Sequence, residues 1–280
     1  MRRLALLLLP LTLLFAACQS NNVTEDNSLK RLFDSAGVTG SFGLFDNSQG
    51  QFTIYNLSAF KDSAYLPAST FKIVNSLVGL QTGRISNINM VIPWDGVTRF
   101  YPLGDTALGW NKDLGMKEAF QASAVPYYQE VARRIGKDTM QYWLDTLGYG
   151  QRYGKFKIKD NLDTFWLDNS VKVTGDEQLG LVKKLYFDQL PFFKSTQQAV
   201  RAVMLQEENA NYRLSYKTGW GFQPNGKPVG WIIGWIEENK HPYFFSLEVN
   251  ASNPKFDMRP ARINILKGIL TQMGFFNGKK

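Results

Sequence analysis

Three Ser-x-x-Lys matches occur in the 280-residue chain: Ser58–Lys61 in SAFK, Ser69–Lys72 in PASTFK and Ser252–Lys255 in SNPK. On one helix face, a serine and a lysine three residues apart could act as a nucleophile and its base. The proline of SNPK disfavours a helix there. We expect SAFK to continue a strand, in which residues three apart face opposite sides. Only PASTFK opens a long helical pattern, so this match supplies the candidate pair.

Lys72 lies at the first turn of a helical pattern over residues 70–83, whose apolar positions cover most of the helix circumference. A lysine is badly placed there, because the helix dipole favours anions at this end and burial disfavours the charged amine. Such strain is typical of functional sites; the alternative is an amine that extends to solvent. The only histidine, His241, lies in a polar turn before a strand, where we expect it to be exposed and not catalytic.

Composition excludes several kinds of site. Cys18 is the only cysteine, so the rest of the chain can form neither a disulfide nor a thiolate zinc site. With a single histidine as well, we expect no metal. The net charge is +8, but the basic residues are scattered, and we find no zinc finger or basic stripe. We therefore do not expect a nucleic-acid partner.

The N-terminus is predicted to be an export signal. Residues 1–18 combine two arginines, an apolar run broken by proline, and small residues before Cys18. This order is similar to a lipoprotein signal, with Cys18 as the possible lipidation site and membrane attachment; the alternative is an ordinary signal with an incidental cysteine. Residues 19–28 are polar and are predicted to form a tether. The protein should then lie in the periplasm or cell envelope.

Residues 29–280 are predicted to form a single α+β domain. Strand patterns lie at both ends, over about 37–60 and 212–280, and helical patterns fill about 68–207. The last helical pattern starts near residue 262. This order predicts one antiparallel sheet built from both ends of the chain, flanked by helices, with a mostly helical subdomain inserted between the two parts.

Further short motifs follow PASTFK in the chain. Ser123-Ala124-Val125 precedes a proline at a helix junction, Trp166-Leu167 follows later, and Lys217-Thr218-Gly219 lies on a predicted strand. Together and in this order, the motifs resemble those of the penicillin-recognising serine enzymes. The chain is most similar to the class D, oxacillinase-type, β-lactamases, and the resemblance covers about residues 30–275. The domain should therefore have the β-lactamase/transpeptidase-like fold.

The resemblance implies roles for particular residues. Ser69 corresponds to the acylated nucleophile and Lys72 to the general base, which this family carries as an N-carboxylated lysine formed with CO2 or bicarbonate. Ser123 and Lys217 correspond to a proton-transfer and electrostatic pair. Trp166 would donate a hydrogen bond to the carbamate. No other cofactor is implied.

The remaining assignments concern the pocket and the substrate. Phe71, Val125 and Leu167 would line the apolar pocket around the modified lysine, together with Trp166. The backbone N–H groups of Ser69 and Trp220 would form the oxyanion hole. Thr218 and Gly219 would contact the substrate beside them.

Two positions depart from the family pattern. The family's Tyr-Gly-Asn corresponds to Tyr149-Gly150-Gln151, with Tyr149 favoured over Tyr153, and the role of the glutamine is open. The arginine for the substrate carboxylate is Arg259 or Arg262. We favour Arg262, because the apolar positions that follow it then match the family's final helix.

The resemblance implies hydrolysis of β-lactam antibiotics through a serine acyl-enzyme, with the carboxylated lysine as base in acylation and deacylation. One alternative is a penicillin-binding or β-lactam-sensing domain that is acylated without turnover. An alternative from another class is a non-catalytic lipoprotein of the cell envelope that only binds cell-wall peptide.

Overall fold

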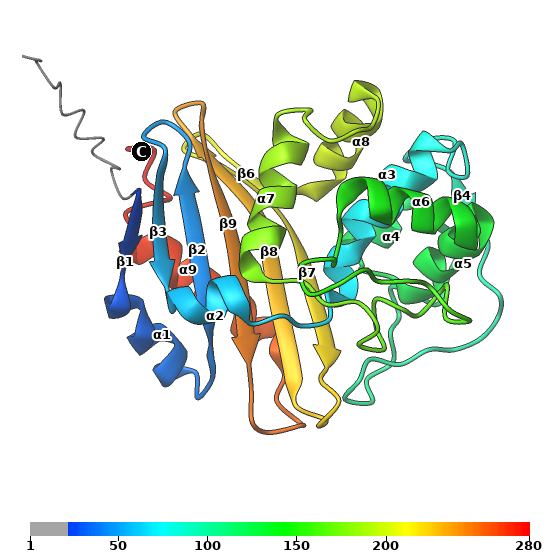
Figure 1. The fold of residues 1–280 in the computed structure, drawn as a ribbon, viewed down its shortest axis with the longest axis horizontal. Coiled ribbons are helices and arrows are strands. Elements are labelled where there is room, and N and C mark those ends of the chain that lie inside the picture. Colours follow the sequence, from blue (N-terminus) through cyan, green and yellow to red (C-terminus); the bar gives the residue numbers. More distant parts are fainter. Residues whose placement is uncertain (1–21) are drawn as a thin grey trace, which may run out of the picture.

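A computed structural model describes residues 22–280. Figure 1 shows a twisted sheet with helices on both faces and, beside it, a lobe made mainly of helices. The predicted signal at residues 1–18, including Cys18, lies outside the described residues. No helix among residues 22–280 is long and apolar enough to cross a bilayer.

The sheet has seven strands in the order β1-β3-β2-β9-β8-β7-β6, and all neighbours are antiparallel except β1 and β3. The strands are β1 (Val23–Glu25), β2 (Thr39–Asp46), β3 (Gln51–Tyr55), β6 (Leu205–Glu208), β7 (Arg213–Phe222), β8 (Pro228–Glu238) and β9 (His241–Asn250). Since β2 pairs with β9, the two ends of the chain meet in the middle of the sheet. The predicted α+β architecture is confirmed.

The prediction of a polar tether over residues 19–28 is wrong for the part that the structure describes. β1 pairs in parallel with Phe52–Ile54 of β3, and a 3₁₀ helix, η1 (Asn27–Leu29), follows it. The hydrogen bonds of β1 join backbone groups, so its polar side chains do not oppose pairing with the sheet edge. Leu29 is fully buried and fixes the end of this segment in the core.

Helices cover both faces of the sheet (Figure 1). They are α1 (Lys30–Ser35) and α9 (Met258–Gln272) on one face, and α2 (Leu57–Asp62) and α7 (Gly175–Tyr186) on the other. Side chains of β8 alternate between the two cores: Trp231 and Ile233 join the core under α7, whereas Ile232 joins the core under α9. Because both faces of β8 are buried, its sequence PVGWIIGWIEE is a nearly continuous apolar run.

The second lobe contains most of the helices predicted between residues 68 and 207, but α7, which also lies in this range, packs on the sheet instead. Its helices are α3 (Lys72–Gln81), α4 (Met116–Gln121), α5 (Val125–Ile135), α6 (Lys137–Leu147) and α8 (Lys194–Met204), with a small sheet of β4 (Val91–Ile92) and β5 (Leu114–Gly115). Every residue of α3 from Lys72 to Gly79 is buried. The helix pattern of this segment therefore predicted its central position in the lobe.

The expectation that SAFK continues a strand is wrong, because this segment lies in α2. Asn56 adopts a left-handed conformation, and its side chain accepts a hydrogen bond from the N–H of Ala59, which begins the helix. Ser58 and Lys61 are both exposed. The SAFK match is therefore distinguished from PASTFK by exposure and not by its secondary structure.

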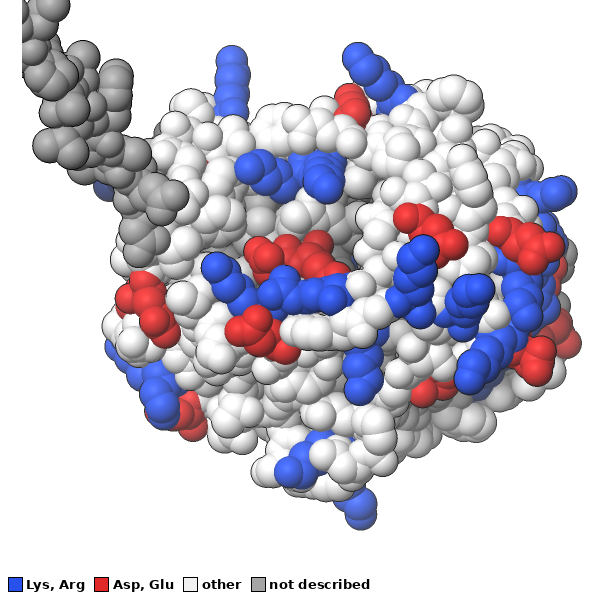
Figure 2. Space-filling view, in the orientation of Figure 1, with Lys and Arg blue, Asp and Glu red and all other residues white. Residues whose placement is uncertain are grey.

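Charged side chains are distributed over the surface. On the face drawn in Figure 2, Lys and Arg side chains are spread over the surface, with several side by side at the right edge, and Asp and Glu side chains lie among them. Ion pairs between the described residues include Arg152 with Asp62 and Arg134 with Glu130. The surplus of positive charge is not gathered into one stripe on this face.

Candidate active site

The candidate nucleophile lies on a strained turn. A 3₁₀ helix, η2 (Ala68–Phe71), carries Ser69 and leads directly into α3. Ala68 has φ +48°, a left-handed conformation that is unfavourable for alanine. Its N–H donates to the carbonyl of Trp166 at 3.0 Å, which holds the turn in place. Strain of this kind occurs where the surrounding structure fixes a functional residue.

Four predicted residues meet in one network. Lys72 Nζ lies 2.5 Å from Ser69 Oγ and 3.4 Å from Ser123 Oγ. Lys217 Nζ, from β7, donates to Ser123 Oγ at 2.9 Å. Ser123 also has a left-handed backbone, with φ +55°. Residues from η2, α3, β7 and the α4–α5 junction therefore converge on one point between the sheet and the helical lobe.

Burial sets the protonation of the two lysines. Lys72 is fully buried, and desolvation lowers its pKa to about 7. Burial, the Lys72 amine and Arg262 together hold the pKa of Lys217 well below its usual value. The amine of Lys72 is then largely neutral above pH 7, and it can accept the proton of the Ser69 hydroxyl.

An aromatic cluster surrounds the buried end of this network. Phe71 stacks on Trp166 with ring centroids 5.2 Å apart, and it also contacts Phe165 and Tyr149. The indole nitrogen of Trp166 is buried and has no hydrogen-bond partner among the described residues. A buried donor without a partner costs about 1–3 kcal/mol, so this N–H marks a position suited to an acceptor.

A cleft of about 680 Å³ opens from Ser69 to the surface. Val125 and Leu167, both predicted pocket residues, line it. Thr218 and Trp220 contribute the wall on the side of β7. Strand β6 pairs only with the first residues of β7, over Arg213–Ser215, so the later part of β7 lies against η2 and the cleft.

The two candidate arginines have different environments. Arg262 is buried, lines the cleft, donates to the carbonyl of Gly219, and keeps its Nε without a partner among the described residues. Burial lowers its pKa to about 10, so it remains charged at neutral pH. Arg259 is paired with Asp257 and Asp105, each at 2.8–2.9 Å. The arrangement favours Arg262 as the cleft cation that is free to bind an anion.

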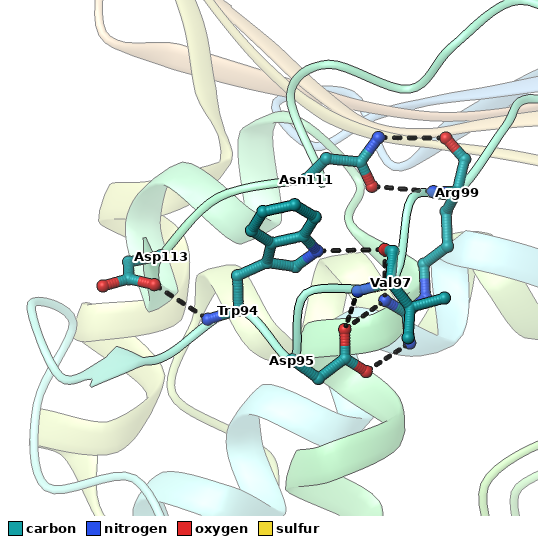
Figure 3. A network of polar contacts seen from close by, with 6 residues as sticks. All are labelled: Trp94, Asp95, Val97, Arg99, Asn111 and Asp113. Carbon is teal, nitrogen blue, oxygen red and sulfur yellow. Dashed lines mark hydrogen bonds and ion pairs between the residues drawn. The ribbon is translucent and has the colours of Figure 1, made fainter.

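The far wall of the cleft is a loop over residues 93–113 that sequence reasoning did not assign to the site. Figure 3 shows its internal contacts: Arg99 makes two 2.6 Å bonds to the carboxylate of Asp95, and its backbone pairs with the side chain of Asn111. These contacts fix the loop, and Tyr101 and Trp110 from it line the cleft. The only signal in the sequence was the number of aromatic residues in an otherwise polar loop.

The Tyr-Gly-Gln segment lies behind the nucleophile and not at the cleft surface. Tyr149 is buried with its ring centroid 5.5 Å from that of Phe71. Tyr153, the alternative, is 64% exposed and contacts Asp62. The side chain of Gln151 donates to Asp145 at 2.7 Å. Its amide is thus bonded to the preceding helix α6, and the position assigned to Tyr149 lies beside the predicted pocket.

Comparisons with known proteins agree with this geometry. A family model described as the penicillin-binding protein transpeptidase domain matches residues 34–271. The β-lactamase OXA-5 of Pseudomonas aeruginosa is 33% identical over 261 residues, covering 92% of this chain and 93% of that protein.

Two solved structures are also similar. The class D β-lactamase FUS-1 from Fusobacterium nucleatum subsp. polymorphum is 31% identical, with a TM-score of 0.81, over 92% of this chain and 100% of the other. The C-terminal domain of the Bacillus licheniformis BlaR penicillin receptor is 28% identical, with a TM-score of 0.82, over 92% and 98%. The fold, the converging serine and lysine residues and these similarities together show that the chain belongs to the class D β-lactamase family.

Proposed function

We propose that the protein hydrolyses β-lactams through a covalent acyl-enzyme on Ser69. The observation that carries this proposal is the 2.5 Å contact between Ser69 Oγ and a Lys72 amine whose pKa burial lowers to about 7. A neutral amine in contact with the hydroxyl can take its proton while the oxygen attacks. Membership of the class D family supports the same reaction.

Acylation follows from the positions of the side chains. Ser69 Oγ forms a bond to the β-lactam carbonyl carbon, and its proton passes to the base at Lys72. When the C–N bond of the ring breaks, the nitrogen needs a proton. Ser123 Oγ, which Lys217 contacts at 2.9 Å, is the hydroxyl placed to deliver it, and Lys72 Nζ, 3.4 Å from Ser123 Oγ, can return to Ser123 the proton it took from Ser69. The backbone N–H groups of Ser69 and Trp220 are the proposed oxyanion hole.

We propose in addition that Lys72 carries a carboxyl group on its amine. Two observations support this. Burial leaves about half of the amine in the neutral form that adds CO2 at pH 7. The Trp166 N–H, whose ring stacks on Phe71, is buried without a partner among the described residues. A carbamate would supply an anionic base both for acylation and for activating the water that hydrolyses the acyl-enzyme. CO2 or bicarbonate is the only requirement that we propose.

The substrate carboxylate is proposed to bind at Arg262. This guanidinium is charged, lines the cleft and has a free Nε. Thr218 lies on the same wall, and Gly219 is already in contact with the arginine through its carbonyl. Charge-assisted bonds of this type contribute about 1.5–3 kcal/mol each.

The similarity to the BlaR penicillin receptor supports a second candidate, a domain that is acylated but does not turn over. The two functions differ in the fate of the acyl-enzyme. Incubation with a chromogenic cephalosporin should give continuous hydrolysis, and Ser69→Ala should give none. A single stoichiometric burst, with a lasting adduct in the intact mass, would instead support the receptor function.

We also propose that residues 1–18 direct export and that Cys18 attaches the protein to a membrane. The support is the order of charged, apolar and small residues before the only cysteine. Metabolic labelling with palmitate should mark the wild-type protein but not Cys18→Ser. Labelling that persists in the variant, or is missing from both, would contradict lipidation at this residue.

A further inference from the structure

A buried chain of side chains connects the nucleophile turn to α7. Gln178 is 1% exposed and donates from Nε2 to Thr70 Oγ1 at 2.7 Å. Thr70, itself fully buried, donates from the same hydroxyl to the carbonyl of Pro67 at 2.7 Å. Pro67 and Thr70 flank the strained Ala68 and the nucleophile Ser69. The bond from Gln178 thus ties this turn to a helix more than a hundred residues later in the sequence, and the bond from Thr70 to Pro67 closes the turn itself.

The direction of these bonds is determined by the atoms. A carbonyl oxygen only accepts, so the single hydroxyl proton of Thr70 goes to Pro67. Thr70 Oγ1 can then only accept from Gln178, and the atom that faces it has to be an N–H donor. An amide meets this requirement, and an apolar side chain of the same length does not.

Neighbouring structure fixes both Gln178 and the turn to which it is hydrogen-bonded. α7 begins with a capping box, in which Thr174 and Glu177 exchange hydrogen bonds, and Gln178 follows directly. On the opposite side of the turn, Gly219 of β7 approaches so closely that a Cβ would lie 2.9 Å from the Pro67 oxygen and 3.2 Å from Thr70 Cγ2. The turn is therefore held between β7 on one side and Gln178 on the other.

We propose that Gln178 is a positioning residue for the reaction at Ser69. Through Thr70 it keeps the strained turn in the conformation that places Ser69 Oγ against Lys72 and the cleft. Gln178 does not line the cleft and touches neither Ser69 nor Lys72 by a hydrogen bond. The inference rests on the proposed acylation of Ser69. It adds that the strained turn must be held in place, which neither Lys72 nor the pocket residues do.

The test compares Gln178→Met, Thr70→Val and the double variant. Gln178→Met removes the donor to the Thr70 hydroxyl, and Thr70→Val removes the hydroxyl that bonds to both Gln178 and Pro67, so each single change should lower the stability. Replacing both partners by apolar groups of similar shape should restore much of it. The acylation rate should not recover in the same way, because no variant keeps both the bond from Gln178 to Thr70 and the bond from Thr70 to Pro67. We expect acylation of Ser69 by a penicillin to be about 10- to 100-fold slower in all three, with the dissociation constant of the noncovalent complex unchanged.

Gln197→Met is the matched control. Gln197 is also fully buried and bonds to Leu190 and Phe192 within the helical lobe. The variant should lose stability and keep the wild-type acylation rate. The proposal is overturned if acylation recovers together with stability in the double variant, or if Gln197→Met slows acylation as much as Gln178→Met does.

A second probe separates this proposal from the proposed function. A small fluorophosphonate modifies an activated serine and needs no β-lactam recognition. If the wild-type protein reacts with the fluorophosphonate but not with penicillins, the proposed β-lactam hydrolysis is wrong. The order of fluorophosphonate reaction rates among the variants then still tests the positioning role of Gln178. Equal fluorophosphonate rates in the wild-type protein and Gln178→Met would refute the positioning role whatever the substrate is.

Discussion

Acidification should inactivate the protein through Lys72, and the size of the effect follows from its burial. Desolvation disfavours the charged amine and lowers its pKa from 10.5 to about 7. The neutral fraction of such a group is about 90% at pH 8, half at pH 7 and about 10% at pH 6. The acylation rate should therefore fall about tenfold from pH 8 to pH 6 at a fixed, low concentration of bicarbonate.

Bicarbonate should oppose this loss, because carboxylation removes the neutral amine from the protonation equilibrium. The apparent pKa of the acid limb should move lower as bicarbonate is raised. Trp166→Phe removes the unpartnered indole N–H and keeps an aromatic ring beside Phe71. Losing one hydrogen bond to a charged group is worth about 1.5–3 kcal/mol, so the variant should need about 10- to 100-fold more bicarbonate for half-maximal activity.

The assay is stopped-flow measurement of acylation and deacylation over pH 5.5–8.5 in a bicarbonate series, with ¹³C-labelled bicarbonate to detect the carbamate by NMR. Trp143→Phe is a suitable control, since Trp143 stacks on Phe192 in the helical lobe, away from the cleft. Acylation that is flat with pH would refute the assigned base. A Trp166→Phe variant that deacylates like wild type, with neither protein responding to bicarbonate, would refute the carbamate.

Three further predictions concern other residues. Ser69→Ala should abolish acylation, because the Thr70 hydroxyl is bonded to Pro67 and Gln178; an adduct on Ser58 or Ser252 in peptide mapping would contradict the assignment. Arg262→Ala should lower kcat/KM about 10- to 100-fold, equivalent to about 1.5–3 kcal/mol. Arg259→Ala should have a smaller effect, because the Arg259 side chain is already paired with two aspartates. The opposite order in steady-state kinetics would exchange the roles of the two arginines. Burial raises the pKa of Glu248 from 4.5 to about 8, so folding favours its protonated form. This contribution is complete below about pH 4.5 and is lost as the pH rises through 8, by about 1.4 kcal/mol per pH unit between these values. Glu248→Gln should remove that slope. Urea unfolding of both proteins at pH 5, 6 and 7 measures it, and a difference in the free energy of unfolding that stays constant with pH would contradict the prediction.

The regular elements could be predicted because their local patterns agree with their final environments. The apolar run PVGWIIGWIEE is a strand buried on both faces, and the pattern around Lys72 is a helix buried on all sides. The hairpin of β2 and β3 follows the turn residues between them. In each segment, periodicity and burial point to the same structure.

The remaining features depend on partners that are distant in sequence. α2 begins at Asn56 through a left-handed cap, which the preceding strand pattern concealed. The loop over residues 93–113 is fixed by contacts between its own polar side chains, and its aromatic residues meet the cleft only after folding. The bond from Gln178 to Thr70 joins positions 108 apart. No short-range pattern contains such information.

The charges buried in the site favour anionic ligands. Lys72, Lys217 and Arg262 are all buried within it, and no ion pair with a carboxylate neutralises any of them among residues 22–280. Burial disfavours the charged form of each and lowers its pKa, and the pKa of Lys217 is lowered further by the neighbouring charges of Lys72 and Arg262. The arrangement therefore favours ligands that bring negative charge. A carbamate at Lys72 would supply one anion and the carboxylate of a β-lactam a second. The destabilised free site would then bind its reactants more tightly because they relieve a repulsion already present in the folded chain.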